Sequence, residues 1–351
     1  MRIGIPKEVK TQEGRVALIP AAVAELIYEG HELIMQAGAG ELSGYPDEAF
    51  SRLGARIVPD ARALYEGSEL IVKVKEPQPE ELERLRSDHR LFCYLHLAAE
   101  PELTRALLDI GLTAVGFETV TAANGHLPLL APMSEIAGRI AVQVGSHYLY
   151  QPTGGRGVLL GGIASTTRGK VVILGAGMAG RNAAALAVAL GANVTVFDTN
   201  MDKLAAMHEL GANVTALYPY ADSLQAAVVD ADLLIGAVLI PGARAPHLVN
   251  ADTVREMKAG SVIIDISVDQ GGCIETTRPT SYADPVFTWE GVVHFGVTNM
   301  PGAVPRTSSQ AISAALIPYV KRIARDDWQQ DAGLKAGINV MNGAIVHPAL
   351  K

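Results

Sequence analysis

The segment KVVILGAGMAG, residues 170–180, constrains the fold of this chain more than any other part of the sequence. An apolar run leads into Gly175, Gly177 and Gly180, and the alanine-rich stretch RNAAALAVAL follows directly. Glycines at the GxGxxG spacing between a strand and a helix are typical of dinucleotide-binding sites. The first permits a tight turn, the second lets the backbone approach a pyrophosphate, and the third lets helix and strand pack closely. The segment therefore predicts an α/β fold with a dinucleotide at a helix N-terminus.

An acidic residue at the end of the next apolar run indicates which dinucleotide binds. Asp198 closes the run 193–198, at eighteen positions beyond Gly180, and the fingerprint expects an acid after about twenty. A carboxylate there accepts hydrogen bonds from the ribose hydroxyls of NAD and repels the 2′-phosphate of NADP, so we predict NAD as the cofactor. A glycine-rich turn followed by an unrelated surface acid is the alternative, but the agreement of strand, glycines, helix and acid disfavours it.

Strand-like and helical patterns alternate along the whole chain, which predicts two α/β blocks with parallel sheets. A helical pattern at 133–150, with Ser134 as its expected N-cap, separates the blocks and places a boundary near residues 128–134. The tail 307–327 is expected to be helical, with Pro318 kinking or dividing the helix. The expected strands are 2–5, 32–36, 69–75, 91–95 and 112–117 in the first block, and 170–175, 193–198, 214–217, 232–237, 261–269 and 292–297 in the second.

The composition narrows the class of protein. Hydrophobic residues make up 49% of the 351 residues and charged residues 19%, which predicts an ordered globular chain. The formal net charge of −8 argues against a nucleic-acid partner. No apolar run reaches the ~18 residues of a membrane helix, and no signal peptide is visible, so we expect a cytoplasmic protein without a membrane partner. Cys93 and Cys273 lack metal-ligand spacing and are expected to be buried thiols.

Four polar residues outside the glycine segment are candidates for chemistry. Lys75, His96 and Asp269 close or follow expected strands, and Arg15 lies in the loop after the first strand. Ligands bind at this edge of an open parallel sheet. Each residue alone has an ordinary interpretation as a solvated side chain, a core histidine or a turn residue. Together they supply an arginine for a carboxylate, a lysine for a carbonyl, a histidine for proton transfer and an acid for charge.

Two charged residues inside expected strands, Lys73 and Asp265, are interpreted as structural partners. Residues 299–301, NMP, follow the last strand of the second block and are expected to line the nucleotide cleft, with a plain loop as the alternative. The motifs of zinc metalloproteases, serine hydrolases and P-loop proteins are missing from the sequence.

Longer runs around these motifs resemble the bacterial L-alanine dehydrogenases. The resemblance extends from residue 1 to about residue 345, with the runs in the same order. The wider family also includes the NAD-binding subunit of proton-translocating transhydrogenase, but the filled substrate positions favour alanine dehydrogenase. The matching runs are RIGIPKEVKTQEGRVALIP (2–20), LIVKVKEP (70–77), LHLAAEP (95–101), LLAPMSEIAGR (129–139), VVILGAGMAG (171–180), GAVLIPGARAP (236–246), IIDISVDQGGCIETTRPTSY (263–282) and VTNMPGAVPRTSS (297–309).

The resemblance implies a role for each matching residue. Arg15 binds the substrate carboxylate and Lys75 its carbonyl or amino end, while His96 is the acid/base and Asp269 the second catalytic group. The implied contacts to NAD, beyond the three glycines, are Ser134, Met178, Ala179, Asp198, Lys203, Val238, Leu239, Ile266, Ser267, Val268, Asp269, Arg278, Val297, Thr298, Asn299 and Met300.

The resemblance also implies the architecture. Two Rossmann-like, doubly wound domains with parallel sheets are expected, and the cofactor binds in one while the substrate binds in the other. The NAD domain, residues 131–306, is inserted into a discontinuous catalytic domain made of residues 1–130 and 307–351. A homo-oligomer is expected, because a hexamer is typical of the family.

Two positions depart from the family pattern. Tyr220 stands where a serine is often found. Some members hold a divalent metal with the counterpart of Glu118 and a C-terminal histidine, and that histidine is replaced within residues 324–327. No metal site is therefore expected.

Taken together, the candidates predict the reversible oxidative deamination of L-alanine to pyruvate and ammonium. Hydride leaves Cα of a neutral amine, and water that attacks the resulting iminium is deprotonated by His96 or Asp269, a choice the sequence leaves open. Three alternatives also stay open: a transhydrogenase subunit that binds no amino acid, a non-catalytic NAD-sensing protein, and a dehydrogenase of a larger amino acid.

Overall fold

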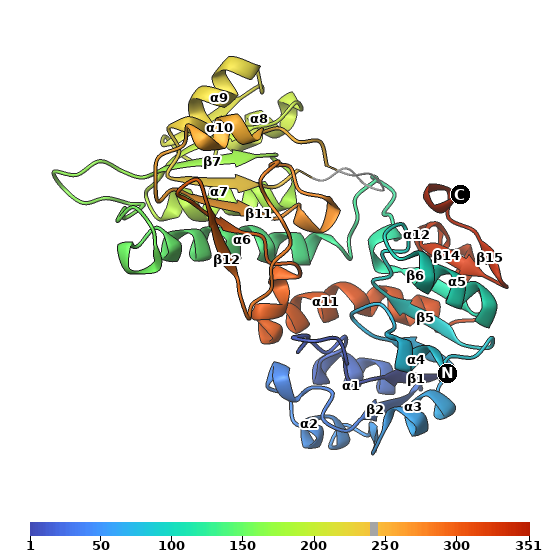
Figure 1. Ribbon diagram of the computed structural model, residues 1–351. Helices are drawn as coiled ribbons and strands as arrows, with labels where there is room; N and C mark the ends of the chain where they lie inside the picture. The colour runs from blue at the N-terminus through green and yellow to red at the C-terminus, as the bar shows by residue number, and fades with distance from the viewer. Residues whose placement is uncertain (239–244) are drawn as a thin grey trace. The chain divides into compact units, whose positions relative to one another are not determined.

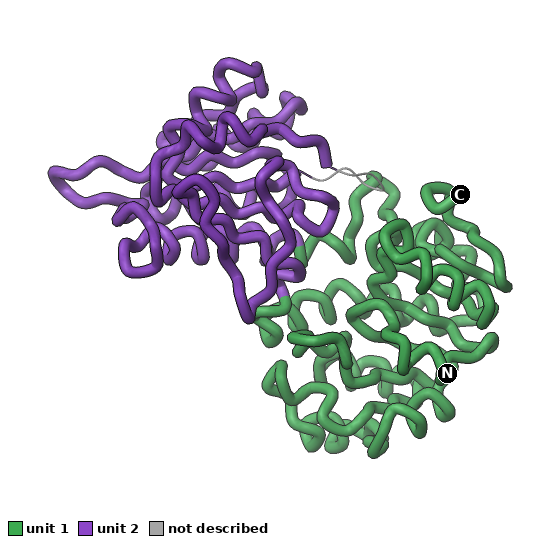
Figure 2. The backbone as a smooth tube through the Cα atoms, viewed as in Figure 1, with its two compact units in different colours: residues 1–133, 302–351 green, residues 134–301 purple. Residues whose placement is uncertain are grey.

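The structure is a computed structural model that describes residues 1–238 and 245–351. The chain folds into two compact units, and the first, residues 1–133 and 302–351, is interrupted by the second, residues 134–301 (Figure 2). Among the described residues, none of the helices combines the length and the apolar character that crossing a bilayer requires.

The first unit is built around a mostly parallel sheet. Its strands are β1 (Arg2–Ile5), β2 (Glu32–Gln36), β3 (Arg56–Val58), β4 (Leu70–Val72), β5 (Arg90–Cys93), β6 (Thr113–Gly116), β14 (Ile338–Met341) and β15 (Ala344–Ile345). The order is β15-β14-β6-β5-β4-β1-β2-β3 (Figure 1). Strands β1 to β6 run parallel to their neighbours, whereas β14 pairs antiparallel with β6 and β15. The helices are α1 (Pro20–Tyr28), α2 (Asp47–Ser51), α3 (Ala61–Gly67), α4 (Pro79–Leu82), α5 (Pro101–Ile110), α11 (Pro305–Ile323) and α12 (Ala332–Ala336).

The second unit has a sheet of the same kind. Its strands are β7 (Lys170–Leu174), β8 (Asn193–Phe197), β9 (Val214–Leu217), β10 (Leu233–Gly236), β11 (Val262–Asp265), β12 (Val286–Trp289) and β13 (Val292–Phe295). The order is β12-β13-β11-β10-β7-β8-β9, and only β12 pairs antiparallel among these strands. The helices are α7 (Met178–Ala189), α8 (Met201–His208), α9 (Ala221–Val229) and α10 (Ala251–Arg255), while α6 (Ala131–Tyr148) spans the boundary between the units.

The expected α/β class with two Rossmann-like sheets is confirmed, and the physical reason lies in the burial of the strands. The central strands β4, β10 and β11 are buried along their whole length. Parallel strands covered on both faces are nearly continuous apolar runs, and the segments LIV, LLIG and VIID fit that pattern. Antiparallel strands appear only at or near the sheet edges.

Several local expectations are wrong. Helix α6 begins at Ala131, so Ser134 lies inside its first turns and is not the N-cap. Pro132 suits the start of a helix because its missing N–H has no intrahelical partner there. Helix α11 begins earlier than expected, at Pro305, and Pro318 lies inside it and does not divide it, so only the kink stays a prediction. The edge strands β3, β12 and β15 and the strand β14 next to β15 were not expected, since short segments carry little apolar pattern.

A buried cluster of charges ties the first unit together. The ammonium of Lys73 lies 3.0 Å from a carboxylate oxygen of Glu8 and 3.2 Å from one of Glu81, and all three side chains are almost completely buried. The hydroxyl of Tyr65 donates to Glu81 at 2.9 Å. Burial opposes the charged form of Lys73, but the two carboxylates outweigh it and hold the pKa of Lys73 above its ordinary value. Lys73 therefore is a structural partner, as its place in the chain indicates.

We expect Lys73→Met to destabilise the protein strongly. The substitution leaves the carboxylates of Glu8 and Glu81 buried without a counter-charge, and breaking one side of a buried ion pair costs about 3–5 kcal/mol. Urea denaturation of the variant and of Arg62→Met, which removes an exposed cation, measures the difference in the free energy of unfolding. Equal stability of the two variants would contradict a structural role for Lys73.

Candidate functional site

The C-terminal edge of the second unit's sheet carries most of the residues predicted to bind a dinucleotide. Residues 175–180 follow β7, Asp198 follows β8, Val238 follows β10, residues 266–269 follow β11, and residues 297–300 follow β13. These strands are parallel, so their C-terminal ends meet at one edge. The order of connection reverses between β7 and β10. Such a reversal opens the crevice in which ligands bind in doubly wound sheets.

Each of the three glycines at this edge has a different structural role. Gly175 has φ +100°, a conformation that favours glycine. A Cβ on Gly180 would lie 1.8 Å from the carbonyl oxygen of Gly175, so no side chain fits there. Gly177 is the N-cap of α7, and a Cβ on it would meet no described atom within 4 Å beyond its chain neighbours. The fold itself therefore requires Gly175 and Gly180, whereas the open space at Gly177 leaves room for a ligand's phosphates.

Asp198 lies beside this glycine turn. One of its carboxylate oxygens accepts the backbone N–H of Ala176 at 2.7 Å, and the other accepts that of Asn200 at 2.8 Å. The carboxylate is thus oriented on the same edge as the N-terminus of α7. Lys203 and Tyr220 are exposed nearby in sequence, at the first turn of α8 and at the N-cap of α9.

A buried acid shapes the loop after β11. Asp265, which is 0% exposed, accepts the backbone N–H groups of Ser267 and Cys273, each at 2.9 Å. Burial raises the pKa of Asp265, and these hydrogen bonds oppose the rise. The hydroxyl of Ser267 donates to the carbonyl of Val238 at 2.7 Å, which links this loop to the end of β10. Asp269 is exposed at the tip of the loop, beyond the strand that was expected to reach it.

The remaining predicted cofactor contacts differ in exposure. Met178 is 41% exposed at the start of α7, and the exposed Arg278 lies 4.3 Å from the ring centre of Phe287. Asn299 has φ +58°, which is typical of a tight loop. Leu239 lies outside the described residues. The other predicted contacts of this unit are half-buried or buried, except for the exposed Thr298.

The first unit brings three predicted residues to the C-terminal edge of its own sheet. Arg15 lies in the loop after β1, Lys75 follows β4, and His96 follows β5. The connection order reverses between β1 and β4, so Arg15 and Lys75 flank the crevice position of this sheet. Asp269 belongs to the second unit.

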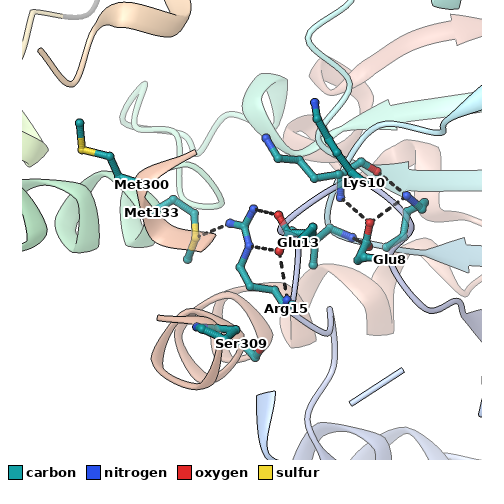
Figure 3. A network of polar contacts seen from close by, with 12 residues as sticks. Glu8, Lys10, Glu13, Arg15, Met133, Met300 and Ser309 are labelled. Carbon is teal, nitrogen blue, oxygen red and sulfur yellow. Dashed lines mark hydrogen bonds and ion pairs between the residues drawn. The ribbon is translucent and has the colours of Figure 1, made fainter. Parts of the chain in front are cut away.

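The Arg15 guanidinium is fixed by a buried carboxylate. Its Nε and Nη2 donate to the two oxygens of Glu13 at 2.7 and 2.5 Å, and Nη1 donates to the sulfur of Met133 at 3.1 Å (Figure 3). The residue is only 2% exposed. Burial opposes the charged form of Arg15, but Glu13 outweighs it and keeps the pKa raised. Arg15 is therefore a permanently charged group in a defined orientation.

Lys75 is a half-buried cation close to another cation. Burial and, next, the positive charge of Arg15 lower the pKa of Lys75, while Glu76 and Glu13 oppose the shift and Lys10 adds to it. Lys75 consequently releases its proton at a lower pH than an ordinary lysine. An anion that binds both side chains would relieve this repulsion.

The backbone at His96 adopts an uncommon conformation. His96 has φ +51°, and its N–H and that of Leu95 both donate to the carboxylate of Glu118, at 2.7 and 3.1 Å. The exposed imidazole stacks on the ring of Tyr94, with centroids 5.9 Å apart. The Tyr94 hydroxyl donates to the carbonyl of Leu129 at 2.6 Å. Glu118 and Tyr94 thus set the direction of the histidine ring.

Among the described residues, no group of three or more metal-binding side chains could hold a metal ion.

Comparison with known proteins decides the family. The N-terminal domain profile of alanine dehydrogenase/PNT matches residues 4–137, and the C-terminal domain profile matches residues 141–348. The chain belongs to the alanine dehydrogenase/PNT family.

Family relatives match over the full length of the chain. An alanine dehydrogenase of Halomonas elongata is 47% identical over 100% of this chain and 96% of its own. A solved L-alanine dehydrogenase superposes with a TM-score of 0.96 at 49% identity and covers 100% of this chain and 98% of its own. A solved transhydrogenase from Sinorhizobium meliloti superposes with a TM-score of 0.86 at 27% identity, over 99% and 100% of the two chains. The resemblance noted in the sequence is therefore confirmed.

The sequence alone did not reveal the residues that orient Arg15 and His96. Glu13, Tyr94 and Met133 contact Arg15 or His96, and Glu118 was considered only as the counterpart of a metal ligand. Glu13 could have been noticed, since an acid two positions from a buried arginine is a natural partner. Glu118 lies far from His96 in sequence, and no local pattern reveals its hydrogen bonds.

We expect Gly180→Ala and Gly177→Ala to differ in their effect on stability. The first forces a methyl group against the carbonyl of Gly175 and should cost about 1–3 kcal/mol. The second replaces an N-cap glycine where space is open and should cost less than about 1 kcal/mol. Thermal unfolding followed by circular dichroism measures both. A larger loss for Gly177→Ala would contradict the open space described there.

Proposed function

We propose that this chain is an NAD-dependent L-alanine dehydrogenase that interconverts L-alanine, water and NAD with pyruvate, ammonium and NADH. The observation that carries the proposal is that two cations, Arg15 and Lys75, follow the adjacent strands β1 and β4 at the edge of a sheet that also presents His96 after β5. The full-length similarity to alanine dehydrogenases supports it.

The substrate is bound through its charges. Arg15 offers a fixed planar cation to the carboxylate, which suits a group with two equivalent oxygens. Lys75 follows β4, the strand next to β1, and its ammonium is proposed to contact the carbonyl oxygen of pyruvate beside the carboxylate. A cation in this position stabilises the negative charge that develops on oxygen during water addition and release.

His96 moves the protons of the reaction. Hydride leaves Cα only when the amine is neutral, because the nitrogen lone pair must form the iminium. A ring nitrogen of the imidazole can accept a proton from the amine or from the attacking water. Asp269 is proposed as the second catalytic group, exposed at the tip of its loop.

The dinucleotide site of the second unit fits NAD. The space at Gly177 and the N-terminus of α7 suit the pyrophosphate, and the oriented carboxylate of Asp198 suits the ribose hydroxyls. When bound, NAD supplies the carbon that accepts the hydride. The proposed contacts are Ser134, Gly175, Gly177, Met178, Ala179, Gly180, Asp198, Lys203, Val238, Leu239, Ile266, Ser267, Val268, Arg278, Val297, Thr298, Asn299 and Met300.

The proposal includes the cellular compartment and the oligomeric state of the enzyme. A cytoplasmic location accords with two cysteines, Cys93 and Cys273, that are buried and free, since cytosolic thiols stay reduced. A homohexamer is proposed from the family resemblance.

The decisive experiment is an absorbance assay of the nicotinamide with a panel of amino acids plus NAD, and of 2-oxo acids plus ammonium and NADH. We expect turnover with L-alanine and pyruvate, and we expect His96→Asn to abolish it while NADH still binds. Asparagine tolerates a positive φ better than most residues, so the backbone is preserved. Turnover by His96→Asn would remove His96 from its role, and NADH binding without alanine-dependent reduction would favour a transhydrogenase subunit or a sensor.

We expect Asp198→Asn to narrow the preference for NAD over NADP. The amide retains one oxygen for the N–H of Ala176, but it loses the acceptor for the N–H of Asn200 and the charge that repels a 2′-phosphate. The ratio of kcat/KM for the two cofactors should fall by roughly tenfold, which corresponds to about 1.4 kcal/mol. Asp222→Asn, at an exposed acid of the same unit, is the matched control. A ratio equal to that of the control would place the ribose elsewhere.

A further inference from the structure

The buried charge cluster of Glu8, Lys73 and Glu81 contacts the backbone of Lys75 directly. Glu8 accepts the N–H of Val74 at 2.5 Å and that of Lys75 at 3.4 Å. The ammonium of Lys73 donates to the carbonyl of Lys75 at 3.0 Å. The cluster therefore contacts Lys75 on both sides of its Cα, so it limits how this residue can move.

The cluster also joins three separate segments of the first unit. Glu8 lies in the same loop after β1 as Glu13 and Arg15 (Figure 3). Lys73 follows β4, and Glu81 lies in α4. Glu81 accepts in addition the N–H of Gln78 at 2.9 Å, at the start of α4. The distance between the loop that carries Arg15 and the segment that carries Lys75 is thus fixed through buried ion pairs.

Stability alone does not account for such a cluster. Burial raises the pKa of Glu8, and the neighbouring carboxylates of Glu81 and Glu13 add to the rise, while Lys73 and the N–H of Val74 oppose it. Buried ion pairs are often no more stabilising than apolar residues of similar volume. A fold that needed only stability could fill this space with apolar side chains.

We propose that Glu8, Lys73 and Glu81 are positioning residues that hold Lys75 next to Arg15, so that both cations reach one 2-oxo acid. The inference rests on the proposed function, and it assigns the cluster a role in substrate recognition. None of the three residues touches the substrate. Their contribution is the placement of the Lys75 backbone.

The first test is the triple variant Glu8→Gln/Lys73→Met/Glu81→Gln. It removes all three charges together and nearly keeps the side-chain volumes, so none of the three positions is left with an unpaired buried charge, and we expect the variant to fold. It removes the ammonium that binds the Lys75 carbonyl. We expect KM for pyruvate to rise roughly 10- to 100-fold, as small misplacements of binding groups do, while KM for NADH stays within about twofold.

The second readout does not depend on turnover. Acylation of Lys75 by acetic anhydride, followed by mass spectrometry over a range of pH, gives the midpoint at which the amine becomes reactive. Burial and Arg15, opposed by Glu76 and Glu13, set the lowered pKa of Lys75 in the native protein. When Lys75 is released from this position, the midpoint should move upward by roughly one pH unit, a tenfold change in reactive amine at fixed pH.

Glu8→Asp is the companion variant if the triple variant does not fold. It keeps the charge but shortens the side chain, so an upward midpoint shift reports the placement of Lys75 and not a change of charge. The control is Arg62→Met/Glu66→Gln, which removes an exposed ion pair on α3. The control should match the wild type in both measurements.

A folded triple variant, or Glu8→Asp, with an unchanged KM for pyruvate or an unchanged Lys75 midpoint would overturn the proposal. If the wild type fails to reduce pyruvate, the proposed function is wrong, and the Lys75 midpoint alone then decides whether the cluster positions this residue.

Discussion

Carboxylates that accept backbone N–H groups beyond the ends of strands are the constraint on which the rest of the site depends. Glu8 accepts the N–H of Val74 next to Lys75, Glu118 accepts that of His96, and Asp265 accepts that of Cys273 in the loop that carries Asp269. Loops at the edge of a sheet have no ladder to satisfy their N–H groups. Each carboxylate accepts hydrogen bonds that a neighbouring strand would otherwise accept. The loop backbone beside each catalytic candidate is thereby held in one position.

The same arrangement explains how the first unit holds several charges in little space. Arg15 is neutralised by Glu13, and Lys73 by Glu8 and Glu81, whereas Lys75 keeps a lowered pKa because burial and Arg15 act on it. The structural cation Lys73 is thus paired inside the protein, while Glu13 orients the guanidinium of Arg15. Arg15 and Lys75 are the cations of this edge that an anionic ligand would bind, and the placement of the carboxylates accounts for this difference.

Much of this fold could be predicted from the sequence, since the buried parallel strands and the Gly175–Gly180 turn follow from local patterns. The candidates Arg15, Lys75 and His96 were found because the polar residues after strands meet at one edge. The roles of Glu8 and Glu118 could not be found, because their partners lie 66 and 22 residues away in sequence. The uninterrupted helix at Pro318 was missed for a related reason: tertiary packing overrides local preference.

The insertion of one unit into the other sets an order of assembly. Strand β14 pairs with β6 in the first sheet and belongs to the last part of the chain. During synthesis the ribosome releases it only after the whole second unit has emerged. Until then β6 is an unpaired sheet edge, the kind of surface on which nascent chains aggregate. The carboxyl-terminal tail therefore acts as the closing piece of a unit that begins at the first residue.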